Sequence, residues 1–191
     1  MRTIIVASGQ PNKGDTWRKW VRAGDRIIGA DGGAARALAW GLAPDLVIGD
    51  LDSLSARQRK ALEARGCPFL VHPRAKDDTD LELALTYAAE QGAQEIVILG
   101  ALGGRLDHTL ANLLLLALPQ LAGRSVRLVD GLEEALLLRS GGRPSSRGSR
   151  ATWSRSCPWT AMPAASRLPA SPGRSRQAPS ASPSAAALAT R

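Results

Sequence analysis

The sequence predicts an α/β domain built on a doubly wound parallel sheet over residues 1–130. Short runs rich in β-branched residues alternate there with longer segments of helical periodicity, which is the pattern of successive β-α-β units. Several helical segments also carry start and stop signals, so a helix is expected between most neighbouring strands. A sheet of this kind is Rossmann-like, and its order of elements indicates where a ligand would bind.

Six strands are expected, at residues 3–7, 26–30, 46–48, 69–71, 96–99 and 126–129. Capping boxes that begin at Ser55 and Thr79 predict two helices, which end near Arg65 and Glu90. The apolar run 113–118 belongs to the core of a further helix, which the following proline ends. The run 135–139 resembles another strand, but the sequence after it offers no strand with which it could pair.

Charge and composition divide the chain into two parts. The 191 residues carry a formal net charge of +8, but all 17 acidic residues and 17 of the 25 basic ones lie in residues 1–142, where they cancel. The 49 residues 143–191 contain the other eight basic residues, all arginines, and 37 of the 49 are Ala, Ser, Arg or Pro. Such a segment buries too little apolar surface to offset the entropy of ordering it, so we expect it to be disordered.

Signals for secretion, membranes and disulfides are absent from the sequence pattern. The apolar run near the N-terminus is too short for a signal peptide, and no window approaches the roughly 18 apolar residues of a membrane span. Cys67 and Cys157 lie far apart and indicate neither a disulfide framework nor a zinc site. A soluble cytoplasmic protein without a membrane partner is therefore expected.

Carboxylates follow four of the predicted strands. Open parallel sheets bind ligands outside the carboxyl ends of their strands, so residues at these positions are the first candidates for a site. Seven of the 17 acidic residues fall there: Asp31, Asp50, Asp52, Asp77, Asp78, Asp80 and Asp107. One such Asp is more often a cap or turn residue, but its recurrence after four strands indicates a shared site.

The chemistry of this edge favours a metal and a phosphate. Converging carboxylates repel one another and need a counter-charge, and Mg²⁺ is a hard cation that suits oxygen ligands. Glycines before two helices could leave N–H groups open to a phosphate: Gly32, Gly33, Gly103 and Gly104. Lys76 and Arg105 are placed to offset phosphate charge. The pattern predicts a nucleotide, Mg²⁺ and phosphoryl-type transfer.

Other local patterns do not indicate a site. The segment GQPNKGDT has the glycine spacing of a Walker A loop, but Asp15 stands where the phosphate-binding lysine belongs, and no GxGxxG follows the first strand. The DxD of GDLDS follows the third strand, whereas the nucleophile of aspartyl-phosphate phosphatases ends the first. His72 and His108 have no partner at metal or triad spacing, so His72 is expected to be structural and His108 at most assists the site.

Four longer motifs occur in a fixed order within residues 1 to about 140. They are ADGGA (30–34), PDLVIGDLDS (44–53), KDDTDLELAL (76–85) and GGRLDH (103–108). In this order and spacing they resemble the bacterial thiamine pyrophosphokinase family. The resemblance implies transfer of a pyrophosphoryl group from ATP to the hydroxyl of thiamine, which gives AMP and thiamine diphosphate and requires Mg²⁺.

The resemblance also implies roles for single residues. The family's acidic positions, which hold the metal and triphosphate or act as base, correspond here to Asp50, Asp52, Asp77, Asp80 and Asp107. Arg105 would join these residues in catalysis. The residues expected to hold nucleotide and phosphates are Asp31, Gly32, Gly33, Ser53, Lys76, Thr79, Gly104 and His108. Which aspartate is the base is left open.

The resemblance stops near residue 140. Members of the family have a C-terminal β-sandwich domain and resemble homodimers in which that domain helps to bind thiamine beside the other subunit's carboxylates. Residues 131–142 are expected to begin this domain, whereas the composition of residues 143–191 does not fit it. We therefore expect that the β-sandwich domain is missing from this chain and that its kinase activity is low or absent.

A frame slip would account for the loss. When residues 151–163 are back-translated and regrouped one nucleotide earlier, they can read GDLVSLLPLDGDA, and residues 164–175 can read GGVTTAGLAWPL. Both strings resemble C-terminal segments of the family. We therefore expect a one-base slip between about residues 139 and 151, with residues 143–191 out of frame.

Two other functions stay open on the sequence alone. The carboxylates would also suit another Mg²⁺-dependent nucleotide or sugar-phosphate kinase or phosphatase, which would not depend on thiamine. The tail arginines could instead bind nucleic acid in a salt-sensitive, sequence-independent manner. Against nucleic acid, the arginines are dispersed among Pro and Ala, and only Trp153 and Trp159 could stack on bases there.

Resequencing the gene across codons 135–165 tests the frame slip. One missing or extra base relative to the present reading would restore a β-rich C-terminal domain, because the shifted frame has strand-like patterning. The corrected protein is then expected to release AMP from ATP only when thiamine is present. A confirmed present sequence would instead place the slip in the gene itself and leave a truncated relative of the family with little or no kinase activity.

Overall fold

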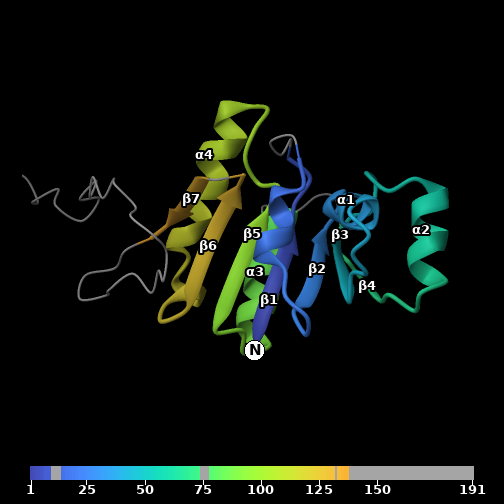
Figure 1. Cartoon of the computed structure of the whole chain (residues 1–191), viewed down its shortest axis with the longest axis horizontal. Helices are drawn as coiled ribbons and strands as arrows, with labels where there is room; N and C mark the ends of the chain where they lie inside the picture. Colours follow the sequence, from blue (N-terminus) through green and yellow to red (C-terminus); the bar gives the residue numbers. More distant parts are fainter. Residues whose placement is uncertain (10–13, 74–77, 132, 138–191) are drawn as a thin grey trace, which may run out of the picture. The chain divides into compact units, whose positions relative to one another are not determined.

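Seven strands form one sheet in the computed structural model, which describes residues 1–9, 14–73, 78–131 and 133–137 (Figure 1). They are β1 (Arg2–Val6), β2 (Arg26–Ala30), β3 (Leu46–Gly49), β4 (Phe69–Val71), β5 (Glu95–Leu99), β6 (Ser125–Asp130) and β7 (Glu133–Leu136). Their order is β4-β3-β2-β1-β5-β6-β7, and every neighbouring pair is parallel except β6 and β7. The chain fills the sheet outwards from β1 in both directions, so the predicted doubly wound arrangement is confirmed.

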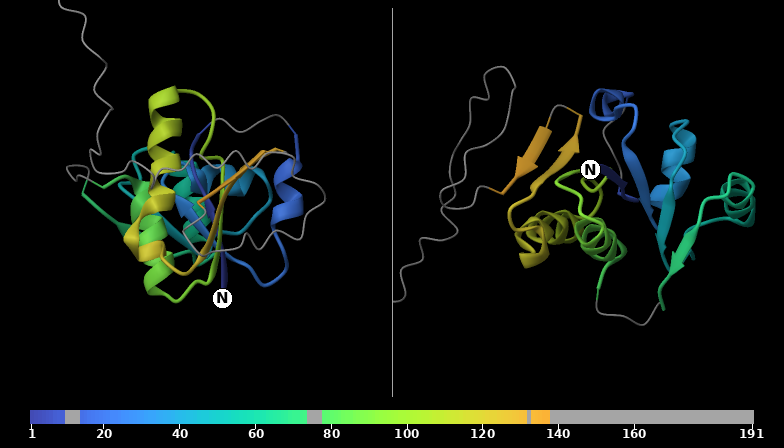
Figure 2. Two further views of the ribbon diagram at one scale, coloured as in Figure 1. Left: turned by 90° about the vertical axis from the view of Figure 1, so that its left-hand side faces the viewer. Right: turned by 90° about the horizontal axis from the view of Figure 1, so that it is seen from below.

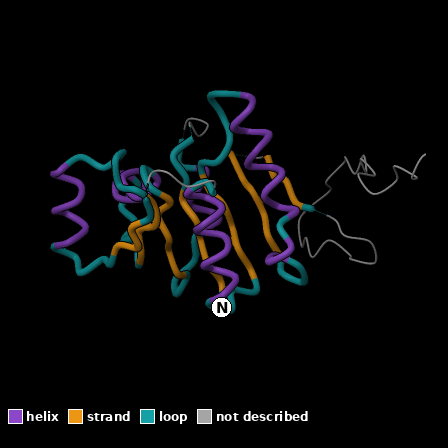
Figure 3. The backbone as a smooth tube through the Cα atoms, turned by 180° about the vertical axis from the view of Figure 1, so that it is seen from behind, coloured by secondary structure: helices purple, strands orange, loops and turns teal. Residues whose placement is uncertain are grey.

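Helices cover both faces of this sheet. They are α1 (Gly33–Ala39), α2 (Ala56–Glu63), α3 (Asp80–Glu90) and α4 (Leu106–Leu114), with short 3-10 helices η1 (Thr16–Trp20), η2 (Leu115–Ala117) and η3 (Pro119–Leu121). α1 and η1 pack on one face, whereas α3, η2 and η3 pack on the other (Figure 2). Figure 3 shows α3 and α4 in front of the sheet when it is seen from behind. The strands β1, β2, β3 and β5 are thus buried on both faces, as a parallel sheet requires, whereas the edge strand β4 leaves Leu70 and Val71 exposed.

Alternate side chains of each strand enter the two halves of the core, as the strand period of two requires. Ile5 and Ile98 pack with α3, whereas Val6 and Val97 pack on the opposite face with α1 and η1. On that second face, Trp17 of η1 stacks on Trp40 at the end of α1, with ring centroids 5.1 Å apart. Because both faces are buried, the central strands read in the sequence as continuous apolar runs.

All six predicted strands are present, and residues 26–30 and 69–71 match to the residue. The strand predicted from residue 135 is present as β7, over Glu133–Leu136. It runs antiparallel to β6, with Glu133 opposite Asp130, whereas the sequence after it, in which no partner is expected, lies outside the described residues. The partner lies upstream, across a turn in which Gly131 adopts a φ of 61°. A hairpin of this kind needs no strand further along the chain.

The helix predicted to contain the run 113–118 is interrupted. α4 ends at Leu114 and the chain continues as η2 to Ala117, so the helical segment stops before Pro119 as predicted. Pro119 then begins η3, because proline loses no hydrogen bond at the first helical position. The expected core position is confirmed for most of the run, because Leu116 is buried and Leu113, Leu115 and Leu118 pack against the same core. Leu114 is half exposed, as is Leu110 one turn earlier, and Leu106 is largely exposed.

Both predicted helix starts are confirmed. The Ser55 hydroxyl accepts a hydrogen bond from the Gln58 N–H, and the Gln58 side chain accepts one from the Ser55 N–H at 2.9 Å, which completes the capping box of α2. The Thr79 hydroxyl accepts a hydrogen bond from the Glu82 N–H at 3.2 Å at the start of α3. These side chains satisfy amides that have no partner within the helix.

Part of the sequence prediction falls outside this structure. Residues 138–142 and the segment 143–191, for which we expected disorder, lie outside the described residues. Within the described ranges, no helix is long and apolar enough to cross a lipid bilayer.

Replacement of the α2 cap tests its contribution to stability. Ser55→Ala removes the hydroxyl that binds the Gln58 N–H, and we expect it to lower the free energy of unfolding by about 1 kcal/mol. Urea denaturation measures the change. Arg57→Ala, at an exposed position of the same helix, is the control. Equal effects of the two substitutions would contradict the assigned cap.

Candidate functional site

A pocket of about 460 Å³ lies where the strand order reverses, beyond the carboxyl ends of β1 and β5. The loops after β1 and β5, the end of β2 and the starts of α3 and α4 all contribute to its wall. Asp31, Asp80, Arg105 and His108 are among its lining residues. This is the switch point at which open α/β sheets bind ligands.

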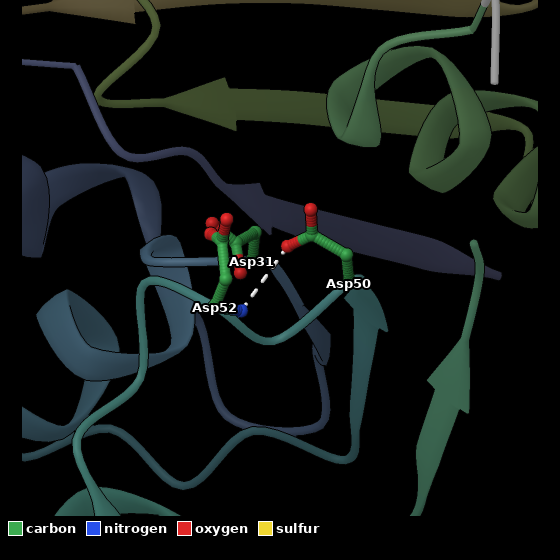
Figure 4. A group of neighbouring side chains, drawn as sticks. All are labelled: Asp31, Asp50 and Asp52. Carbon is green, nitrogen blue, oxygen red and sulfur yellow. Dashed lines mark hydrogen bonds between the residues drawn. The ribbon is translucent and has the colours of Figure 1, made fainter. Parts of the chain in front are cut away.

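Three aspartates converge beside this pocket (Figure 4). Asp31 follows β2, whereas Asp50 and Asp52 follow β3, so two adjacent parallel strands bring them together. One carboxylate oxygen from each lies within 4.8 Å of the others. Asp50 also accepts a hydrogen bond from the Asp52 N–H at 3.1 Å. These are hard oxygen donors of the kind that bind Mg²⁺.

The backbone of this acidic group is strained. Asp31, with φ 44°, and Leu51, with φ 64°, are the two residues other than glycine that have a positive φ in the described part of the chain. Conformations of this kind cost on the order of 1–3 kcal/mol and persist where the surrounding structure holds them. The Leu51 side chain is buried in a cluster with residues of α1, β3 and α2. Its burial therefore stabilises the turn that carries Asp50 and Asp52.

Asp31 shows the clearest fit to a cation. Asp31 is only 7% exposed to solvent, and its Oδ1 atom is buried without a hydrogen-bond partner among the described residues. A buried carboxylate oxygen that lacks a partner is unfavourable, because it has lost its water without gaining a replacement. A divalent cation held with Asp50 and Asp52 would supply that replacement.

Asp80 lies next to the same group because Gly49 leaves room for it. A Cβ placed at Gly49 would be 2.9 Å from the Cβ of Asp31 and 3.2 Å from the Cγ of Asp80. Gly49 also has a φ of 149°, which side chains rarely adopt. A glycine at the end of β3 thus allows carboxylates from β2 and α3 to approach each other.

Arg105 and Asp107 form an exposed ion pair at the pocket. The Arg105 Nε donates a hydrogen bond to Asp107 Oδ1 at 3.1 Å, and its Nη2 donates one to Oδ2 at 2.5 Å. These hydrogen bonds hold the pKa of Asp107 below its ordinary value, and the same contact raises the pKa of Arg105. The Asp107 carboxylate is therefore paired with the Arg105 guanidinium, and it is not part of the group of three aspartates.

Besides Asp31, four of the residues predicted to hold the nucleotide lie at the site. Thr79, Gly104 and His108 line the pocket, although the Thr79 hydroxyl also caps α3. Ser53 lies beside the acidic group, where its hydroxyl donates a hydrogen bond to Asp52 at 3.3 Å. The loop before α4 and the turn after β3 therefore both bring polar groups to this end of the sheet.

Two glycines that were also predicted to hold the nucleotide are placed differently. Gly32 and Gly33 begin α1 but do not line the pocket. Gly33 instead permits close packing, since a Cβ there would lie 1.8 Å from the carbonyl oxygen of Val6. Lys76 and Asp77 lie outside the described residues.

Three further polar or glycine residues of the wall have no counterpart among the residues predicted from sequence: Ser8, Gly9 and Asn112. The Asn112 side chain donates a hydrogen bond to the carbonyl oxygen of Ala101 at 2.7 Å. It follows His108 by four residues, so helical spacing indicates that both lie on one face of α4. Ser8 and Gly9 follow β1, so the rule that located the aspartates also applies to them.

The fold and the site together define a doubly wound α/β domain with a pocket and a group of carboxylates at its switch point. The family model described as thiamin pyrophosphokinase, catalytic domain, matches residues 17–128. The chain therefore belongs to the thiamine pyrophosphokinase family.

Individual relatives agree with this assignment. The thiamine pyrophosphokinase of Bacillus subtilis is 36% identical over 131 residues, which are 68% of this chain and 61% of that protein. Its crystal structure superposes with a TM-score of 0.60 at 34% identity, over 68% of this chain and 61% of that one. The thiamin pyrophosphokinase structure from Geobacillus thermodenitrificans gives a TM-score of 0.58 at 34% identity, over 68% and 60%. The chain thus matches about three fifths of the length of these relatives.

Removal of the Arg105 guanidinium tests the cause of the low pKa at Asp107. In Arg105→Met we expect the pKa of Asp107 to rise towards its ordinary value, because the hydrogen bonds that favour the ionised form are lost. In the unchanged protein the pair is intact at neutral pH and is lost as the pH falls through the lowered pKa. An NMR titration of the carboxyl carbon measures both values, with Arg65→Met as control. An unaltered Asp107 titration would contradict the pairing.

Proposed function

We propose that this chain carries the catalytic domain of a Mg²⁺-dependent thiamine pyrophosphokinase, which transfers pyrophosphate from ATP to thiamine and yields thiamine diphosphate and AMP. The convergence of Asp31, Asp50 and Asp52 at the switch-point pocket, in a chain of this family, carries the proposal. The pocket volume supports it, since sites for small ligands have volumes of about 300–1,000 Å³.

The carboxylates fit the metal that this reaction requires. Asp31, Asp50 and Asp52 would hold Mg²⁺, and the unpartnered Oδ1 of Asp31 supports this assignment. Further oxygen donors to the metal or triphosphate would come from the other acidic positions of the family: Asp77, Asp80 and Asp107. When bound, Mg²⁺ neutralises negative charge on the phosphate oxygens.

The remaining task of the protein is to position the reactants. In the proposed reaction the hydroxyl oxygen of thiamine attacks the β-phosphorus of ATP in line with the bond to the α–β bridging oxygen. That bond breaks, AMP leaves, and the hydroxyl proton passes to an aspartate. Transfers of this kind depend on orientation and charge neutralisation more than on covalent catalysis. Arg105, oriented by Asp107, and Lys76 would supply the cationic groups.

We also propose that thiamine binding and a family-type homodimer depend on a C-terminal β domain whose reading frame is altered in residues 143–191. The chain matches about three fifths of the length of its B. subtilis relative, which agrees with this proposal. The corrected protein would then act in the cytoplasm, where ATP is available, and the chain as written would bind nucleotide without efficient transfer.

The acidic group can be tested in the protein encoded by the corrected frame. We expect Asp52→Asn to reduce thiamine-dependent AMP formation by about 10²- to 10³-fold, the usual effect of losing one electrostatic group at a reacting centre. Glu63→Gln is the matched control, because Glu63 is an exposed carboxylate of α2 outside the group of three. Chelation should abolish the activity and Mg²⁺ should restore it.

The same assay separates the competing functions. ATP turnover that does not depend on thiamine would indicate another phosphotransferase or a phosphatase. Equal loss of activity in the two variants would contradict the role of the acidic group. Salt-sensitive binding of nucleic acid that disappears with residues 143–191 would indicate the basic-tail function instead.

A further inference from the structure

The loop after β1 brings two free backbone donors to the pocket. Ala7, Ser8 and Gly9 line the pocket wall. Ala7 still donates a hydrogen bond from its N–H to Leu99 of β5, at 2.8 Å. The N–H groups of Ser8 and Gly9 have no acceptor among the residues that the structure describes. The hydrogen-bond ladder of β1 therefore ends at Ala7, and the next two amides are available to a ligand.

The guanidinium of Arg36, in α1, holds the carbonyl groups of this loop. Its Nη1 donates a hydrogen bond to the Ala7 oxygen at 2.8 Å, and its Nη2 donates one to the Ser8 oxygen at 3.2 Å. The side chain is partly buried, so desolvation lowers the pKa of Arg36, while the charge of Asp130 raises it. Burial of a cation is unfavourable, and these two carbonyl groups together with Asp130 compensate for it.

Two glycines make room for this contact. A Cβ at Gly100 would lie 2.7 Å from Nη1 of Arg36, and a Cβ at Gly9 would lie 2.6 Å from the carbonyl oxygen of Gly100. The loops after β1 and β5 and the guanidinium thus pack without space for a further side chain. Arg36 does not line the pocket itself, but it supports the part of the wall that contains Ser8 and Gly9.

Peptide geometry fixes the direction of the free donors. In a trans peptide the C=O group and the N–H group of the next residue point in opposite directions. The carbonyl of Ala7 shares a peptide with the N–H of Ser8, and the carbonyl of Ser8 shares one with the N–H of Gly9. Because both carbonyl oxygens accept hydrogen bonds from Arg36, both N–H groups are turned away from it. Successive N–H groups arranged in this way form an anion-binding concavity.

We propose that the N–H groups of Ser8 and Gly9 form a phosphate-binding cradle and that Arg36 is the positioning residue that holds it in place. The ligand class is a polyphosphate. The identification of this polyphosphate as the triphosphate of ATP rests on the proposed function. The inference that Ser8 and Gly9 form a phosphate-binding cradle does not rest on it. Neutral backbone donors can bind phosphate oxygens close to Asp31 without a further side chain at the crowded switch point.

Calorimetric titration of the full chain with tripolyphosphate, and separately with ATP, tests the cradle. We expect Arg36→Met to bind both ligands about tenfold more weakly than the unchanged chain, as for the loss of one or two well-placed hydrogen bonds. Arg124→Met is the matched control. Arg124 also binds backbone carbonyl groups, those of Ala89, Ala93 and Gln120, but it does so at the opposite end of the sheet. Its substitution should leave both affinities unchanged.

Two further variants keep the test decisive if Arg36→Met does not fold. Ser8→Pro deletes one N–H donor without touching Arg36, and we expect several-fold weaker binding of tripolyphosphate. Arg36→Lys keeps a donor for the loop, so it should restore part of the affinity lost in Arg36→Met. Unchanged binding in Ser8→Pro, or equal losses in Arg36→Met and Arg124→Met, would overturn the cradle.

The experiments distinguish failure of the cradle from failure of the proposed kinase function. Tripolyphosphate binding that depends on Arg36, without thiamine-dependent AMP formation in the corrected protein, would retain the cradle and reject the kinase. Kinase activity that is insensitive to Arg36→Met and Ser8→Pro would retain the kinase and reject the cradle. A wild-type chain that binds no tripolyphosphate would also reject the cradle.

Discussion

The close approach of α1 to β1 is the constraint on which the site depends. A Cβ at Gly33 would lie 1.8 Å from the Val6 carbonyl oxygen, and a Cβ at Gly29 would lie 2.6 Å from the Cβ of Ala34. Only glycine fits at such distances, so these two residues set how closely the helix lies against the strands. Asp31 is placed in the turn between them, and Arg36 lies one turn further along the same helix. The carboxylate group and the support of the β1 loop therefore share one packing contact.

The acidic group illustrates how a fold can hold like charges together. Two of its members, Asp50 and Asp52, flank Leu51, which has a positive φ, and the third, Asp31, has a positive φ itself. Apolar burial of Leu51 stabilises this geometry, so the energy that offsets the repulsion comes from the core and not from the carboxylates. The group is consequently arranged before any cation arrives, which reduces the reorganisation required on binding.

Sequence reasoning predicted what depends on local pattern and strand position. Strands buried on both faces appear as apolar runs, and the Ser55 cap is a local signal, so both could be predicted. The strand-end rule located Asp31, Asp50 and Asp52, because parallel strands end at one edge. The same rule did not show that Asp107 lies apart from this group, because the Asp107 carboxylate pairs with Arg105, two residues away. The pairing of β7 depends on a hairpin, and the break after α4 depends on packing of single leucines, which composition does not show.

Arg36 was missed for a different reason. An arginine on a short helix usually indicates a solvated face, and only the three-dimensional contact with two carbonyl groups shows otherwise. The same helix ends at Trp40, which stacks on Trp17 with an angle of 14° between the ring planes. Because indole emission depends on the surroundings of the ring, this stacked pair makes the intrinsic fluorescence of the domain sensitive to the position of α1 on the sheet. A tryptophan directly after the helix that carries Arg36 thus serves as an optical probe of that helix.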